Sequence, residues 1–197
     1  MRTLLFLLCG ILILINCQNS TEASSPTVAE EIAQLTTLEK QNTFLEKIAV
    51  DDQYFRKKEA DALRLHGLNS EEHQAALKKM MDMDTDHLQK IEAYLAKYGY
   101  PNKQAHTTRS MFAPWLVIHH ASSDEPRRRN FKYFYEAYKK GDLEDNRLAF
   151  FLGRFYSNTF GERIRWDGPF TVQQELDSML TALDLREITD KIDQKYE

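Results

Sequence analysis

The sequence predicts an all-α protein, a single-domain bundle of about six helices. Apolar residues recur at steps of three and four through most of the chain, which is the spacing of one helix face. No segment alternates apolar and polar residues as a strand does, and no Asn-Gly or Asp-Gly turn joins two β-rich runs. Residues that begin or end helices separate the apolar stretches. The helical domain is therefore expected to span residues 27–197.

The chain begins with a short apolar segment. Arg2 precedes an apolar run from Leu4 to Ile15, which spans about 18 Å as a helix at about 1.5 Å per residue. A bilayer core of about 30 Å requires roughly 20 apolar residues, so the run has the length of a signal-peptide core and is too short for a membrane span. The segment Leu14–Cys17 that follows resembles the lipobox of bacterial lipoproteins, with Asn16 in place of the usual small residue.

That resemblance implies a lipid-anchored protein of the cell envelope. Residues 1–16 are then a signal peptide, Cys17 carries the lipid, and residues 17–26 form a flexible polar tether. Gln18 is not the Asp that retains lipoproteins in the inner membrane, so the outer membrane is the expected location. The mature chain would contain no disulfide, because Cys9 is lost with the leader.

The charge balance excludes one class of partner. The 197 residues include 26 Lys plus Arg against 30 Asp plus Glu, for a net charge of −4. Such a chain lacks the basic surface that nucleic acids require. It is also not attracted to an anionic membrane surface, so membrane attachment depends on the lipid.

The N-terminal half is expected to form three helices. Thr27 and Glu30 make a capping box that begins the first. The second has an apolar face interrupted by Asp52 and Arg56, and Gly67 ends it. The third begins near Asn69 or Ser70 and ends at Gly99, and Pro101 prevents its continuation. Its apolar face is formed by Leu77, Met81, Asp84, Leu88, Ile91, Leu95 and Tyr98.

The C-terminal half continues the helical pattern. Residues 107–121 form an apolar, buried helix in which Pro114 produces a kink or marks the true start. The next helix begins near Asp124 and carries an aromatic face, and Asp142 caps the one after it. The loop 166–169 leads to a further capping box, Thr171 and Gln174, and a helix that buries residues as far as Leu183. The sequence after Leu185 is charged and is expected to fray, and the run Arg127-Arg128-Arg129 is expected on a solvated helix face.

Polar residues that interrupt or end apolar stretches form the candidate functional site. Asp52 and Arg56 lie four residues apart, and Asp84 and His87 three apart, so each pair shares one face of its helix. A carboxylate on an apolar face costs several kcal/mol unless it is paired, so Asp84 requires a partner. The candidate set is Asp52, Gln53, Arg56, Asp84, His87, His120 and Arg154.

These residues also carry a second resemblance. Their order resembles an uncharacterised bacterial domain with the landmarks D-Q-x-x-R, D-x-x-N, G-W-P, Q-H-A, A-Y-L-x-D-R and Y-G-T-Q. The counterparts here are Asp52-Gln53-x-x-Arg56, Asp84-x-x-His87, Gly99-Tyr100-Pro101, His119-His120-Ala121 and Ala149 to Arg154. The chain has His87, Tyr100 and Gly153 where the family has Asn, Trp and Asp, and Y-G-T-Q has no counterpart. The family supplies no activity, so the resemblance selects residues without assigning a reaction.

Two non-enzymatic uses of the cluster are considered. In the favoured one, Arg56 and Arg154 neutralise Asp52 and Asp84 in a structural network that fixes the helix register. In the other, paired arginines bind the carboxylate or phosphate of a small molecule, or a protein partner. The ligand-binding residues would then be Asp52, Gln53, Arg56 and Arg154.

The enzymatic alternative is a small-molecule hydrolase. Its candidate residues are Asp84, His87 and His120, with either histidine as a general base that Asp84 orients. No Ser or Cys nucleophile is evident, so water would attack. Asp84-x-x-His87 resembles one element of a di-metal bundle, but no second such element follows. Neither a metal nor another cofactor is therefore expected.

Overall fold

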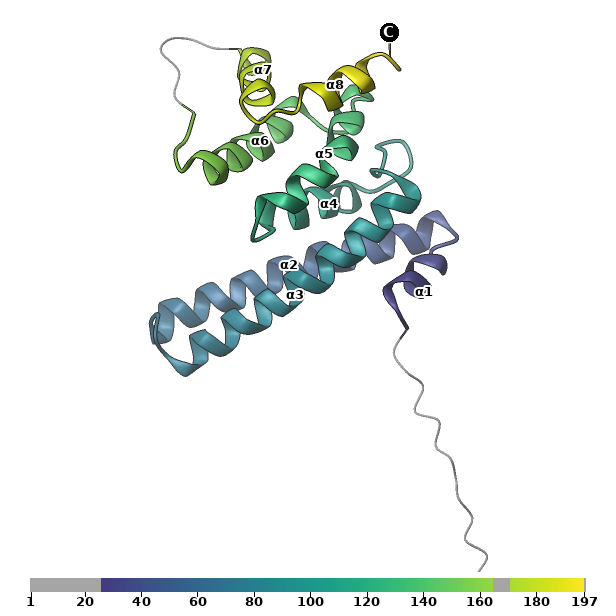
Figure 1. The fold of residues 1–197 in the computed structure, drawn as a ribbon. Helices are drawn as coiled ribbons and strands as arrows, with labels where there is room; N and C mark the ends of the chain where they lie inside the picture. Colours follow the sequence, from purple (N-terminus) through teal and green to yellow (C-terminus); the bar gives the residue numbers. More distant parts are fainter. Residues whose placement is uncertain (1–25, 165–170, 197) are drawn as a thin grey trace, which may run out of the picture.

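Two long helices form an antiparallel hairpin on which two other helices pack (Figure 1). The computed structural model describes residues 26–164 and 171–196. The hairpin consists of α2 (Leu38–His66) and α3 (Glu71–Tyr98). The short helix α1 (Val28–Ala33) packs on α3, and α4 (Thr108–His120) contacts both hairpin helices. The connected ends of α2 and α3 extend beyond the rest of the bundle, as Figure 1 shows.

The remaining helices form a second layer beyond α4. Helix α5 (Asp124–Lys139) contacts α4, α6 (Asp145–Phe160) and α8 (Arg186–Asp193). Helix α7 (Val172–Ala182) packs mainly on α6. The fully buried side chains that join the layers include Leu45, Ile91, Ile118, Phe131, Phe134, Leu148 and Phe151.

The predicted fold class is confirmed, because the described residues form helices in one domain and no strand. There are eight helices in the described part, compared with about six expected, and α1 and α8 are short. The expectation that the sequence after Leu185 frays was wrong. Residues Arg186–Asp193 form α8, because Ile192 and Thr189 are buried against the bundle.

The helix starts agree with the capping patterns at most positions. Thr27 and Thr171 both make the predicted capping boxes. Pro114 lies inside α4, so it does not mark the start of that helix. The prediction that Asp142 caps the following helix was wrong, since Glu144 is the N-cap and the Asp142 carboxylate accepts a hydrogen bond from the Lys103 backbone.

Several predictions concern residues outside the described part. These are the signal peptide (residues 1–16), the lipid-bearing Cys17, most of the tether (residues 17–26), and the loop 166–169. Within residues 26–164 and 171–196, no helix is both long enough and apolar enough to cross a bilayer.

A buried histidine ties the connected ends of the hairpin together. His73 is 2% exposed, and its two ring nitrogens face two acceptors. Nε2 lies 2.8 Å from the Glu59 carboxylate, and Nδ1 lies 2.7 Å from the Leu68 carbonyl oxygen. Both nitrogens can donate only when the ring is protonated. The Glu59 hydrogen bond, with help from the Leu68 carbonyl, raises the pKa of His73 above its usual value.

We expect this pair to make the stability of the protein depend on pH. Because the folded-state pKa is raised, the stabilisation is fully present below the unfolded pKa of about 6.5 and is lost as the pH rises through the folded pKa. The free energy of unfolding, measured by urea denaturation, should therefore fall as the pH increases from neutrality. The variant His73→Gln should show a smaller fall, and an identical pH dependence in both proteins would refute the assignment.

Candidate functional site

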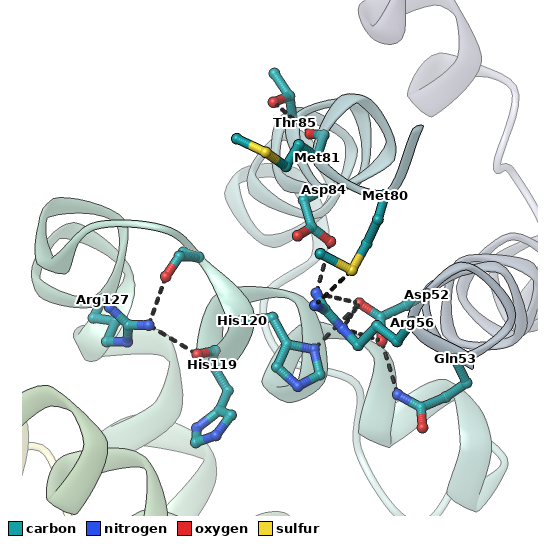
Figure 2. Close-up of polar contacts among 11 residues, drawn as sticks. Asp52, Gln53, Arg56, Met80, Met81, Asp84, Thr85, His119, His120 and Arg127 are labelled. Atoms are coloured by element: carbon teal, nitrogen blue, oxygen red, sulfur yellow. Dashed lines mark hydrogen bonds and ion pairs between the residues drawn. The ribbon is translucent and has the colours of Figure 1, made fainter. Parts of the chain in front are cut away.

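Five of the seven predicted polar residues meet where α2, α3 and α4 come together (Figure 2): Asp52, Gln53, Arg56, Asp84 and His120. Asp52, on α2, is 3% exposed and lies at the centre of the group. Its carboxylate accepts hydrogen bonds from Arg56 on the same helix, from the Gln53 amide at 2.8 Å, and from His120 Nδ1 at 3.3 Å. The carboxylate of Asp52 is thus surrounded by donors from α2 and α4, as a buried charge requires.

Arg56 connects the two carboxylates of the group. Its Nε lies 3.2 Å from both Asp52 oxygens, and its Nη2 lies 3.1 Å from Asp52 Oδ1. The same Nη2 donates to Asp84 Oδ1 at 2.7 Å, which joins α2 to α3. Nη1 lies 3.6 Å from the Met80 sulfur. Asp84 therefore has the partner that its position on an apolar face demands. We call Asp52, Arg56, Asp84 and His120 the Asp–Arg–His cluster.

The two carboxylates of the cluster have opposite pKa shifts. Burial alone would raise the pKa of Asp52, but hydrogen bonds from His120 and Arg56 outweigh it, and the pKa is lowered. Burial raises the pKa of Asp84, and the nearby Arg56 opposes that shift only in part. Asp52 is therefore the carboxylate that stays ionised most firmly, and Asp84 is the weaker acid of the two.

His87 does not join the cluster through a hydrogen bond. It is buried on α3, and its Nδ1 has no hydrogen-bond partner in the described part of the chain. Burial lowers the pKa of His87, so the ring is neutral at physiological pH. Asp84 makes no hydrogen bond with His87, and the histidine that a carboxylate does orient is His120, which pairs with Asp52. The expectation that Asp84 orients a general base was wrong.

Arg154 also lies outside the cluster. It is an exposed residue of α6, and among residues 26–164 and 171–196 it makes no ion pair with Asp52 or Asp84. The expectation that two arginines share these carboxylates was wrong, because Arg56 alone bridges them. Arg154 lies instead beside His119 in a separate cleft.

Two buried polar residues near the cluster were not in the predicted candidate set, and His119 is the first. Its ring is 4% exposed and stacks on Trp115, with centroids 4.6 Å apart, and on Phe150 at 5.0 Å. Burial, reinforced by the charge of Arg154, lowers the pKa of His119 to about 3, so the ring is uncharged. The spacing of four between Trp115 and His119 was the available signal.

Arg127 is the second, and it corrects the prediction of a solvated arginine run. Its side chain is 0% exposed and its guanidinium caps the end of α4. It donates to the carbonyl oxygens of His119 at 2.8 Å and Ala121 at 2.6 Å, and also to Ser123 and to the Asp124 carboxylate. In Figure 2, His119 and His120 lie between Arg127 and Asp52. A cation is favourable at this position, because the last carbonyls of a helix carry partial negative charge.

The described residues offer no ready metal site, since no group of three or more His, Cys, Asp or Glu side chains there is arranged to hold an ion. Comparison of the chain with protein-family models, curated proteins and solved structures finds no match. The resemblances to lipoproteins and to an uncharacterised bacterial domain therefore stay predictions.

Proposed function

We propose that this chain is a lipid-anchored protein of the cell envelope whose helical domain is a non-enzymatic binding or structural module. In this proposal the Asp–Arg–His cluster holds α2, α3 and α4 in register. The lipid on Cys17 attaches the domain to the outer membrane, and the polar residues that follow act as the tether.

The structural role is supported chiefly by the contacts that Arg56 makes within the protein. Its guanidinium already contacts both carboxylates and the Met80 sulfur, so its charge is neutralised by the protein itself. A guanidinium that binds an incoming carboxylate or phosphate needs free donors on one edge. The contacts of Arg56 therefore favour cohesion of the helices over ligand binding at this point.

One contact favours the alternative of a small-molecule hydrolase. Asp52 accepts from His120 Nδ1, which leaves Nε2 as the nitrogen that could accept a proton from water. Against this alternative, neither Asp84 nor His87 makes a hydrogen bond with His120 in the described part of the chain, so the three candidate residues do not form one catalytic group. The anionic-ligand alternative is also weakened at Gln53, whose amide donates to Asp52.

Substitution of Asp84 tests the structural role. Asp84→Ala removes the ion pair between Arg56 of α2 and Asp84 of α3, and we expect a loss of about 1–2 kcal/mol in the free energy of unfolding, since the pair is partly exposed. Chemical denaturation followed by circular dichroism measures this loss. If Asp84 belongs to a reactive site, its removal leaves stability unchanged or increases it. Such a result would contradict the structural proposal.

The lipid anchor has its own test. We expect Cys17→Ser to move the protein from the membrane fraction to the soluble fraction, because the thiol that would be acylated is removed. Cell fractionation and detergent phase partitioning measure the change, with Cys9→Ser as the matched control that keeps Cys17. Unchanged partitioning of Cys17→Ser would exclude acylation at this residue.

A further inference from the structure

A second polar site lies across α4 from the Asp–Arg–His cluster. A cleft of about 710 Å³ opens beside α6, at the end of α4 and the start of α7. This volume lies in the range of about 300–1,000 Å³ that small-molecule sites occupy. His119 lines the cleft, whereas His120 faces Asp52, so adjacent residues of α4 serve the two sites. Figure 2 shows the ring of His119 directed away from Asp52 and Arg56.

Helix α6 presents one continuous stripe to this cleft. Asn146, Phe150, Arg154 and Asn158 follow one another at steps of four, and all of them line it. The opposite face of α6 carries the core residues Leu148, Phe151, Leu152 and Phe155. The stripe is thus the side of α6 that the core does not use.

The described residues that line the cleft carry an excess of positive charge. Arg154 and Arg163 line it, and Glu175 is the one acidic side chain among its described lining residues. His119 adds no charge, because burial keeps its ring neutral. The chain as a whole is acidic, with a net charge of −4, so this local balance is opposite to that of the protein. A guanidinium in such a place suits an oxyanion, which it can bind through two parallel hydrogen bonds.

The cleft also presents an aromatic surface. Phe150 is 62% exposed, although it stacks on His119 with an interplanar angle of 21° and lies 5.9 Å from the centroid of Trp115. The ring of Phe150 is therefore positioned by two buried partners while much of its own surface is free. Because Phe150 and Arg154 are one turn apart, a ring and a guanidinium lie side by side on the same helix face.

We propose that this cleft binds a small molecule that combines an oxyanion, either carboxylate or phosphate, with a flat apolar ring. Arg154 binds the oxyanion with Arg163 nearby, and the ligand ring lies against Phe150. The assignment concerns a site separate from the Asp–Arg–His cluster, so it stands or falls independently of the structural role proposed for that cluster.

Four simple probes test the assignment on the full chain in detergent micelles, followed by two-dimensional ¹H–¹⁵N NMR. Benzoate and phenyl phosphate carry both groups, inorganic phosphate lacks the ring, and benzyl alcohol lacks the charge. We expect benzoate or phenyl phosphate to give saturable shifts at the α6 stripe, with each incomplete probe binding about tenfold or more weakly. The tighter of the two complete probes identifies the oxyanion as carboxylate or phosphate.

Two variants locate the binding. Arg154→Gln should weaken the complete probes about tenfold or more, and Phe150→Ala should bring their affinity down to that of inorganic phosphate. Both side chains are exposed, so the variants retain the fold, and the exposed Arg109→Gln outside the cleft is the matched control with unchanged affinity. The proposal is overturned if no probe gives saturable shifts, if Arg154→Gln binds as wild type does, or if benzyl alcohol binds as tightly as benzoate.

Discussion

Replacing Asp52 by alanine should destabilise the protein by about 3–5 kcal/mol. The carboxylate is buried and accepts from Arg56, Gln53 and His120, so its removal takes the acceptor from Gln53 and His120 and leaves Arg56 paired with Asp84 alone. Buried charged and polar groups have given up their hydrogen bonds to water. When one partner of such a group is removed, the groups that remain lose the contact that replaced that water, and the folded state is destabilised. The free energy of unfolding, measured by urea denaturation, reports this loss directly.

The neighbouring residue provides the control for Asp52. Asp51 has the same side chain and pairs with Lys47 on the exposed surface of α2. Exposed pairs of this kind contribute about 0–1 kcal/mol, so Asp51→Ala should remain close to wild type. If Asp51→Ala and Asp52→Ala lower the free energy of unfolding by similar amounts, the burial of Asp52 adds nothing to its contribution to stability.

Replacing Arg127 by methionine should have an effect of similar size, about 3–5 kcal/mol. Methionine keeps most of the length and apolar volume of the side chain, so the loss reports the polar contacts rather than a void. The carbonyl oxygens of His119 and Ala121 would remain buried without their donor. Thermal or urea denaturation measures the change.

A nearby arginine provides the control for Arg127. Arg129 is partly exposed and pairs with Glu92 and Glu125 at the surface. Arg129→Met should therefore cost less than about 1 kcal/mol. If Arg127→Met is no more destabilising than Arg129→Met, the buried guanidinium does not hold the turn between α4 and α5.

Local patterns predicted the helices well, because each depends on residues close together in the chain. The capping boxes at Thr27 and Thr171 require only a side chain and the backbone three residues further on. The requirement that Asp84 find a partner also followed from its position on an apolar face. Which residue supplies the partner could not be derived, because Arg56 reaches Asp84 only after α2 and α3 pack.

The errors came from contacts that no local pattern encodes. The run of three consecutive arginines predicted a solvated helix face. In the structure, the chain at the end of α4 places carbonyl oxygens against the Arg127 guanidinium, and the side chain is buried. Arg154 was grouped with the acidic residues because it ends an apolar stretch of the sequence. Its helix turns it toward the cleft instead, since the opposite face of α6 is required for the core.

The central claim is that the Asp–Arg–His cluster holds the helices together, and a double-mutant cycle on Arg56 and Asp84 tests it most directly. The cycle compares the free energies of unfolding of wild type, Arg56→Gln, Asp84→Ala and the double variant. We expect a coupling energy of about 1–2 kcal/mol, because the 2.7 Å contact joins α2 to α3. Single effects that add to within about 0.3–0.5 kcal/mol would contradict the claim.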